Sequence, residues 1–208
     1  MVLGIEFLLS GIALGLAEGL SPGPLIALIF SETLKNGKKE GVKVAISPLI
    51  TDSLIILFAL VILSSIAANR IIIGIISFFG ACFLIYLGLR NLNLKIKESE
   101  NRLTKNNALV QGVITNLLNP NTYIFWLSIG GPIVFESAHI HISATLLFIL
   151  GFYITLVGSK ITVAIVVDKS KTLVKSKYYA YIIRALGIVL IVFALIFMID
   201  GFELIGLL

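Results

Sequence analysis

The sequence predicts an all-α membrane protein with six transmembrane helices arranged as an inverted 3+3 repeat, in which helices 1 and 4 are broken. Apolar residues make up 58% of the 208 residues and charged residues 13%, whereas soluble domains contain about 45–50% and 25%. The apolar residues form long blocks that alternate with basic segments. All five prolines lie inside these blocks, where each removes a helical hydrogen bond.

Each of the six blocks is long enough to cross a bilayer, which takes about 20 helical residues. They leave only short loops, so we expect one membrane domain over residues 1–208. A polar linker, residues 91–107, divides it into a first half (1–90) and a second half (108–208). The expected spans are residues 2–31, 41–68, 71–90, 108–135, 143–167 and 179–199.

The basic residues predict the orientation of these spans. Fourteen of the 16 Lys and Arg residues lie in three segments, 35–43, 90–105 and 169–184. Because loops rich in Lys and Arg stay in the cytoplasm, we expect a multi-pass protein of the cell membrane with both termini outside the cytoplasm. Three spans in each half make the second half enter from the opposite side, which is the condition for an inverted repeat.

The first predicted break is at Ser21-Pro22-Gly23-Pro24 in span 1. Prolines lack the backbone N–H, and freed backbone groups in a bilayer cost several kcal/mol each unless something satisfies them. A cavity or ligand at this depth would satisfy them, although a merely kinked helix is the alternative. Every fourth residue from Gly11 to Gly23 is glycine, and this ridge would let another helix or a second copy of the chain pack closely.

The second predicted break surrounds Asn119-Pro120 in span 4. At a rise of 1.5 Å per residue, four features lie roughly 14–18 Å from the cytoplasmic ends of their spans, near the middle of the bilayer. They are the two breaks, marked by Pro24 and Pro120, one acid, Asp52, and one base, Lys160. We therefore expect all four at one site.

Charges at the centre of a span cost roughly 2.5–3.5 kcal/mol, so Asp52 and Lys160 should face the protein interior. Two interpretations remain open: a buried pair that fixes helix packing, or a site for a zwitterionic ligand in which Asp52 binds an ammonium group or carries protons. Glu18 is expected either to line the outward path or to be paired elsewhere. Asn116 and Asn119 either bind substrate or cap half-helices.

Other chemistry receives little support from the sequence. Cys82 is the sole cysteine, which excludes an intramolecular thiol relay. His139 and His141 are too few ligands for a metal site. We expect no cofactor, no bound metal, no nucleic-acid partner and no enzymatic activity.

Several motifs resemble the LysE/RhtB family of amino-acid exporters. They are Pro22-Gly23-Pro24, Gly37 with Gly41, Asp52, Tyr86-Leu87-Gly88, and the run from Gly112 to Pro120. The resemblance implies a small six-span exporter of amino acids or related metabolites, driven by a proton gradient or the membrane potential. It implies functional roles for Pro22, Gly23, Pro24, Asp52, Asn116, Asn119 and Pro120. Asn121 departs from the family pattern, which usually has lysine after Asn-Pro.

The leading hypothesis is therefore an exporter of an amino acid or similar metabolite, whose partners are that substrate and membrane lipid, with a homodimer left open. One alternative is an inorganic or metal-ion exporter of the same superfamily, which would need more ligands inside the spans. The other is a membrane scaffold without transport activity.

Overall fold

The structure is a computed structural model that describes residues 2–62, 70–93, 107–170 and 176–207. Within these ranges the regular structure is entirely helical, with no strand, as the sequence predicts. The elements are α1 (Val2–Leu20), α2 (Pro24–Asn36), α3 (Lys38–Ala45), α4 (Ser47–Ile62), α5 (Arg70–Leu92), α6 (Ala108–Leu117), α7 (Pro120–Phe125), the π-helix η2 (Trp126–Gly130), α8 (Gly131–Ile140), α9 (Ile142–Ser170) and α10 (Ser176–Ile205).

The first predicted break is confirmed. α1 ends at Leu20, α2 begins at Pro24, and the two helices are bent by 62°. Pro24 is the first residue of α2, where its missing N–H needs no partner. The helix continues past the predicted end of this span at residue 31. It ends at Asn36, before Gly37, which adopts φ 96°, a backbone conformation that favours glycine.

The second predicted break is confirmed as well. α6 ends at Leu117 and α7 begins at Pro120. The side-chain oxygen of Asn119 accepts a hydrogen bond from the backbone N–H of Asn121 at 3.1 Å and so caps α7. The hydroxyl of Tyr123 donates to the Leu117 carbonyl at 2.7 Å, which satisfies an acceptor that the break leaves without a helical partner.

A further break, which the sequence analysis missed, divides the predicted second span into α3 and α4 at Ile46. Pro48 explains it, because proline cannot bond to the carbonyl four residues earlier. That carbonyl, of Val44, instead accepts a hydrogen bond from the Ser47 hydroxyl at 2.8 Å. The predicted end of the span falls at residues 63–68, outside the described residues, as does most of the predicted linker 91–107.

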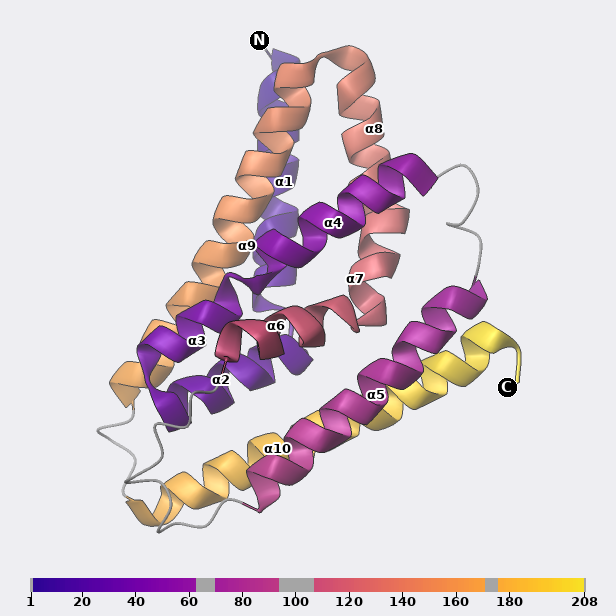
Figure 1. Cartoon of the computed structure of the whole chain (residues 1–208). Coiled ribbons are helices and arrows are strands. Elements are labelled where there is room, and N and C mark those ends of the chain that lie inside the picture. Colours follow the sequence, from indigo (N-terminus) through magenta and orange to yellow (C-terminus); the bar gives the residue numbers. More distant parts are fainter. Residues whose placement is uncertain (1, 63–69, 94–106, 171–175, 208) are drawn as a thin grey trace.

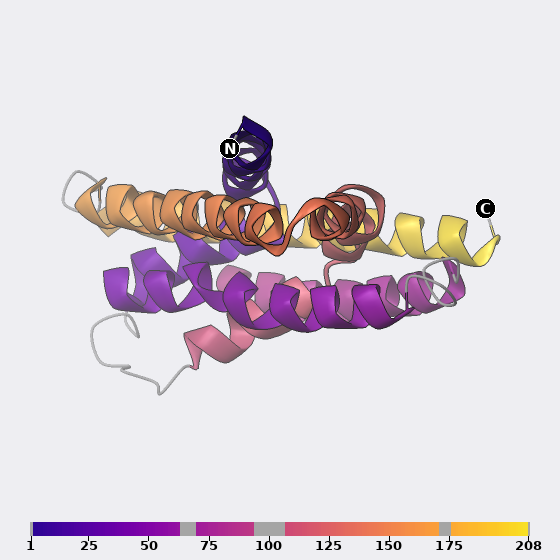
Figure 2. The ribbon, with the colours of Figure 1, turned by 90° about the horizontal axis from the view of Figure 1, so that it is seen from above.

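Two long helix pairs frame the molecule. α1 lies beside α9 and runs in the same direction, whereas α5 and α10 are antiparallel (Figure 1). Viewed from above, α1 stands on the outer side of α9 (Figure 2). In the described part of the chain, three helices are long and apolar enough to span a membrane, or four if the bent α1–α2 pair counts as one span.

The predicted glycine ridge packs α1 against α9 within the chain. A Cβ added at Gly11 or Gly15 would overlap the backbone carbonyl of Phe148 or Phe152, and one added at Gly19 would overlap the Ser159 hydroxyl. This close approach lets the Thr155 hydroxyl reach the Ile12 carbonyl at 3.2 Å. Gly23 lies in the break and takes no part in this contact.

We expect Gly15→Ala to lower the free energy of unfolding by about 1–3 kcal/mol, because the added methyl group forces α1 away from α9. Gly158→Ala is the matched control on α9, since a Cβ there meets nothing within 4 Å. Thermal unfolding of the purified proteins in detergent measures the difference. Equal unfolding midpoints for the two variants would contradict this account of the ridge.

Candidate functional site

A cavity of about 360 Å³ lies where the two helix breaks meet α4 and α9. Every predicted site residue lines it except Pro120, which is buried beside it at the start of α7. The predicted residues in the lining are Glu18, Pro22, Gly23, Pro24, Asp52, Asn116, Asn119 and Lys160. Residues from distant parts of the sequence thus converge at one place, as their common depth predicted.

Asp52, on α4, is only 4% exposed and is held by neutral donors. Its Oδ1 accepts hydrogen bonds from Asn116 Nδ2 at 2.8 Å and from the Thr51 hydroxyl at 3.2 Å. Asn116 also donates to Thr51 Oγ1 at 2.5 Å. Because Asn116 lies just before the second break, this network connects α4 to the broken helix and fixes the position of the carboxylate.

Lys160, on α9, is 5% exposed and binds the other break. Its Nζ donates to the backbone carbonyls of Glu18 and Gly19 at 3.1 and 3.2 Å. These carbonyls belong to the last turn of α1, where helical partners are missing. Lys160 therefore caps α1 at its C-terminal end, where a positive charge is also favourable.

Asp52 and Lys160 form no direct ion pair in the described structure. Each instead binds a different helix break, so their contacts do not support the alternative of a buried pair that fixes helix packing. They remain close enough to interact electrostatically, and so do Lys160 and Glu18. Glu18 is exposed where it lines the cavity. The cavity thus carries two acids and one base.

Of the two predicted asparagines, Asn119 caps α7, as described above, and Asn116 binds Asp52. The side-chain oxygen of Asn116 also lies 3.4 Å from the Thr122 hydroxyl, which donates to it. Asn116 is therefore part of the polar network of the cavity.

Aromatic rings make up one wall of the cavity. Phe125, Trp126 and Phe152 contact one another, with ring centroids 5.2–5.4 Å apart. The indole N–H of Trp126 is directed toward Asp52 but reaches no acceptor in hydrogen-bonding geometry. Leu25, Ile26, Leu156 and Phe193 add further apolar surface.

Sequence reasoning missed three polar residues, of which the structure buries Thr51 and Glu32 and leaves Tyr153 partly exposed. Thr51 joins the Asp52 network, and its position next to the acid was the available signal. Tyr153 on α9 lies within electrostatic reach of Asp52, and no sequence pattern singled it out. Glu32 is 1% exposed on α2 and accepts from Asn36 at 2.6 Å; it was overlooked because the predicted span ended one residue before it.

The part of the chain that the structure describes contains no group of three or more His, Cys, Asp or Glu residues able to hold a metal ion. His139, in the last turn of α8, and His141, directly after that helix, lie apart from the cavity lining. His139 packs edge-on against Phe135, and His141 Nδ1 lies 2.8 Å from the Ser143 hydroxyl.

Comparison with known proteins identifies the family to which this chain belongs. Residues 16–201 match the family model described as "LysE type translocator". A Bacillus subtilis (strain 168) protein named "Putative amino acid efflux protein YcgF" is 24% identical over 205 residues, covering 96% of this chain and 98% of its own length. No solved structure matches. The family match spans most of the chain and both helix breaks, and on that basis the chain belongs to the LysE type translocator family.

Proposed function

We propose that this protein is a secondary transporter that exports an amino acid or a related zwitterionic metabolite across the cell membrane. The observation that carries the proposal is the cavity between the two helix breaks, which holds a buried acid and a buried base. Secondary transporters place their substrates at such breaks near the bilayer midplane. The matched relative bears the name of an amino acid efflux protein, which supports the same substrate class.

The charges suit a small molecule with an ammonium and a carboxylate group. Asp52 is the acid next to the aromatic wall, and a desolvated carboxylate attracts an ammonium group strongly. Lys160 uses two N–H donors on backbone carbonyls but keeps its positive charge inside the cavity. The field between Asp52 and Lys160 therefore orients a zwitterion.

The helix directions support six spans arranged as an inverted repeat. α1 and α9 are parallel and α5 and α10 antiparallel, as expected if spans 1 and 5 run one way and spans 3 and 6 run opposite ways. In Figure 1, the ends of α2, α5 and α9 that carry Lys35, Arg90 and Lys169 point toward the lower left, away from the N-terminus. This arrangement supports a cytoplasmic location for the basic segments and an external N-terminus.

We further propose that export is driven by protons or by the membrane potential, with Asp52 as the proton-carrying group. Asp52 is the buried acid of the cavity, and it bonds to neutral donors instead of a cation at contact distance. A carboxyl group in that setting can change its protonation without breaking an ion pair.

Counterflow in proteoliposomes tests the function. Vesicles preloaded with one unlabelled amino acid should accumulate the same amino acid in labelled form, across a panel of the twenty standard amino acids. An imposed proton gradient and an imposed potential, applied separately, identify the coupling. Zero flux for the whole panel, with metal-ion flux in parallel vesicles, would instead support an inorganic-ion exporter; zero flux for both would support a scaffold.

A further inference from the structure

α5 and α10 are joined tightly along their length. A Cβ added at Gly88 would come within 2.8 Å of the Gly187 carbonyl oxygen, and one added at Gly187 would come within 2.8 Å of the Gly88 carbonyl oxygen. Gly74 and Gly201 repeat this reciprocal contact near the other ends of the two helices, at 3.1 and 3.3 Å. Because small residues let the two backbones approach closely at both places, the α5–α10 pair can move as one body.

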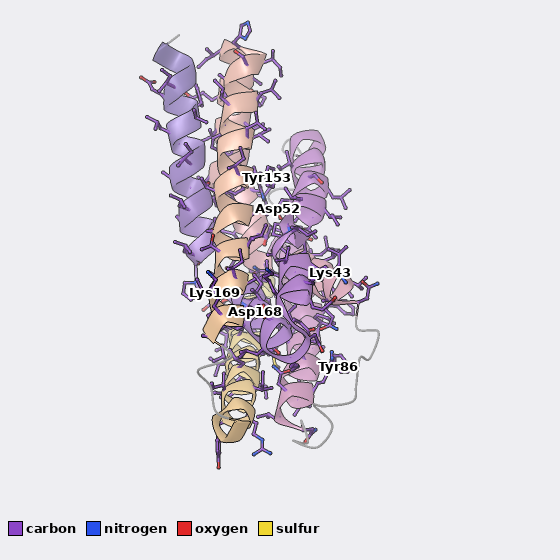
Figure 3. The ribbon with its side chains drawn as sticks, turned by 90° about the vertical axis from the view of Figure 1, so that its left-hand side faces the viewer. Lys43, Asp52, Tyr86, Tyr153, Asp168 and Lys169 are labelled. Atoms are coloured by element: carbon purple, nitrogen blue, oxygen red, sulfur yellow. The ribbon has the colours of Figure 1, made fainter. Side chains whose placement is uncertain are left out.

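This pair covers one side of the cavity and is attached to the rest of the described chain mainly through α2, with smaller contacts to α6 and α7. Phe193 of α10 lines the cavity. Figure 3 places Tyr86 of α5 below Asp52, on the same side of it as Lys169. This end of α5 therefore lies toward the basic segments, which the proposed function assigns to the cytoplasm.

A buried polar contact joins α2 to α5 at this end. The side-chain oxygen of Asn91 accepts hydrogen bonds from the Ser31 hydroxyl at 3.2 Å and from the ammonium group of Lys35. Asn91 is 2% exposed and Ser31 is 0% exposed, so water does not compete for these bonds. We call the contact of Ser31 and Lys35 with Asn91 the latch, since it ties the α5–α10 pair to α2.

Glu32 offers Lys35 a second partner. It is 1% exposed and lies three residues before Lys35 on α2, and residues at this spacing are neighbours on a helix surface. Its Oε2 accepts from Asn36 at 2.6 Å, whereas its Oε1 accepts no hydrogen bond in the described structure. The charges of Glu32 and Lys35 interact without forming an ion pair in the described part of the chain. Lys35 thus has two acceptors within reach and uses the one on α5.

We propose that the α5–α10 pair is the cytoplasmic gate of the cavity, that the latch holds this gate shut, and that the gate opens when Lys35 exchanges Asn91 for Glu32. The inference rests on the proposed function, in which the substrate enters from the cytoplasm. Lys35 gives up one hydrogen bond and gains another in the exchange, so the closed and open states lie close in free energy. A packed interface with two arrangements of this kind is a common form of conformational switch.

The first test measures how fast the cavity is reached from the cytoplasm, and it needs no substrate. Ser21 lines the cavity, and Ser21→Cys in a Cys82→Ser background gives one reactive thiol there. A membrane-impermeant maleimide is added to everted membrane vesicles, whose outer surface is the cytoplasmic face. The labelling rate is then compared between this background and the same protein carrying Asn91→Leu or Glu32→Gln. The controls are Asn93→Leu and Glu136→Gln, at exposed residues of the same two types.

Asn91→Leu should raise the labelling rate about tenfold, because it removes the acceptor of the closed state. Glu32→Gln should lower the rate by a similar factor, because it removes the charged acceptor of the open state, and the two controls should leave the rate unchanged. Since the two variants act in opposite directions, a loss of folding cannot produce both results. An unchanged rate in Asn91→Leu would remove the latch, and an unchanged rate in Glu32→Gln would remove the exchange; either result overturns the inference.

A cross-link connects the gate to transport. Ser31→Cys with Asn91→Cys, again in the Cys82→Ser background, should form a disulfide on oxidation that stops amino-acid counterflow, and reduction should restore the flux. Ser137→Cys with Thr145→Cys is the control, because these hydroxyls lie 2.9 Å apart between α8 and α9 and away from the proposed movement. Undiminished flux through the cross-linked Ser31–Asn91 protein would contradict the gate. If the labelling rates change as expected but no amino acid of the panel is transported, the gate stands and the proposed substrate class fails.

Discussion

Replacing Asp52 with Asn is expected to reduce the rate of amino-acid counterflow roughly 30-fold or more, while the protein remains folded. Asparagine has the same shape and can still accept from Asn116 and Thr51, so the contacts that join α4 to the second break survive. What disappears is the negative charge that binds the ammonium group. Removing one partner of a buried charge interaction costs about 2–5 kcal/mol, and each 1.4 kcal/mol is tenfold.

Glu136→Gln provides the matched control for this experiment, because Glu136 is an exposed acid on α8 that takes no part in the cavity. Counterflow and the thermal unfolding midpoint should be measured for both variants. Asp52→Asn should lose flux and keep its midpoint, and Glu136→Gln should keep both. Undiminished flux in Asp52→Asn would remove the acid from the transport mechanism and, with it, the proton-carrying role proposed above.

The helix breaks could be predicted because proline acts locally. A proline inside an apolar block removes a hydrogen bond whatever surrounds it, and both breaks appeared where Pro22, Pro24 and Pro120 required them. The same rule, applied to Pro48, would also have predicted the break at Ile46. Applied to Pro132, it would have predicted a disturbance in the fourth span, which the structure shows as the π-helical turn η2.

The convergence of the site residues could be predicted from depth alone, because counting residues along a helix gives height in the membrane. The partners of each side chain could not. Asp52 and Lys160 have opposite charges and similar depth, which favours an ion pair, yet each binds a different helix break. That outcome depends on how α4 and α9 are rotated, and a residue count carries no information on rotation.

The polar residues missed from the sequence show the same limit. Trp126 reads as one more apolar residue in a span, and only the folded structure shows that its ring forms part of the aromatic wall of the cavity. Glu32 lies one residue beyond the predicted end of span 1, whereas α2 continues to Asn36 and buries this side chain. Hydropathy describes whole segments, whereas burial of a single polar atom is decided by tertiary contacts.

Replacing Lys160 with Met is expected to lower the free energy of unfolding by about 2–4 kcal/mol and to abolish counterflow. The variant leaves the carbonyls of Glu18 and Gly19 without a donor, and unmet buried polar groups cost about 1–3 kcal/mol each. It also leaves two acids of the cavity, Glu18 and Asp52, without the base that both interact with. Because the variant no longer buries the ammonium group of Lys160, the desolvation energy of that charge is recovered and offsets part of the loss of stability.

A double variant separates the two causes. If Lys160 stabilises the fold partly by compensating Asp52, then adding Asp52→Asn to Lys160→Met should recover about 1 kcal/mol relative to the sum of the single effects. Lys39→Met, at an exposed lysine of α3, is the control and should change stability by less than about 0.5 kcal/mol. Unfolding titrations in mixed micelles measure all four proteins against the parent. Strict additivity would mean that Lys160 acts only as the cap of α1, and that the charge of Asp52 is balanced by the substrate instead of by the protein.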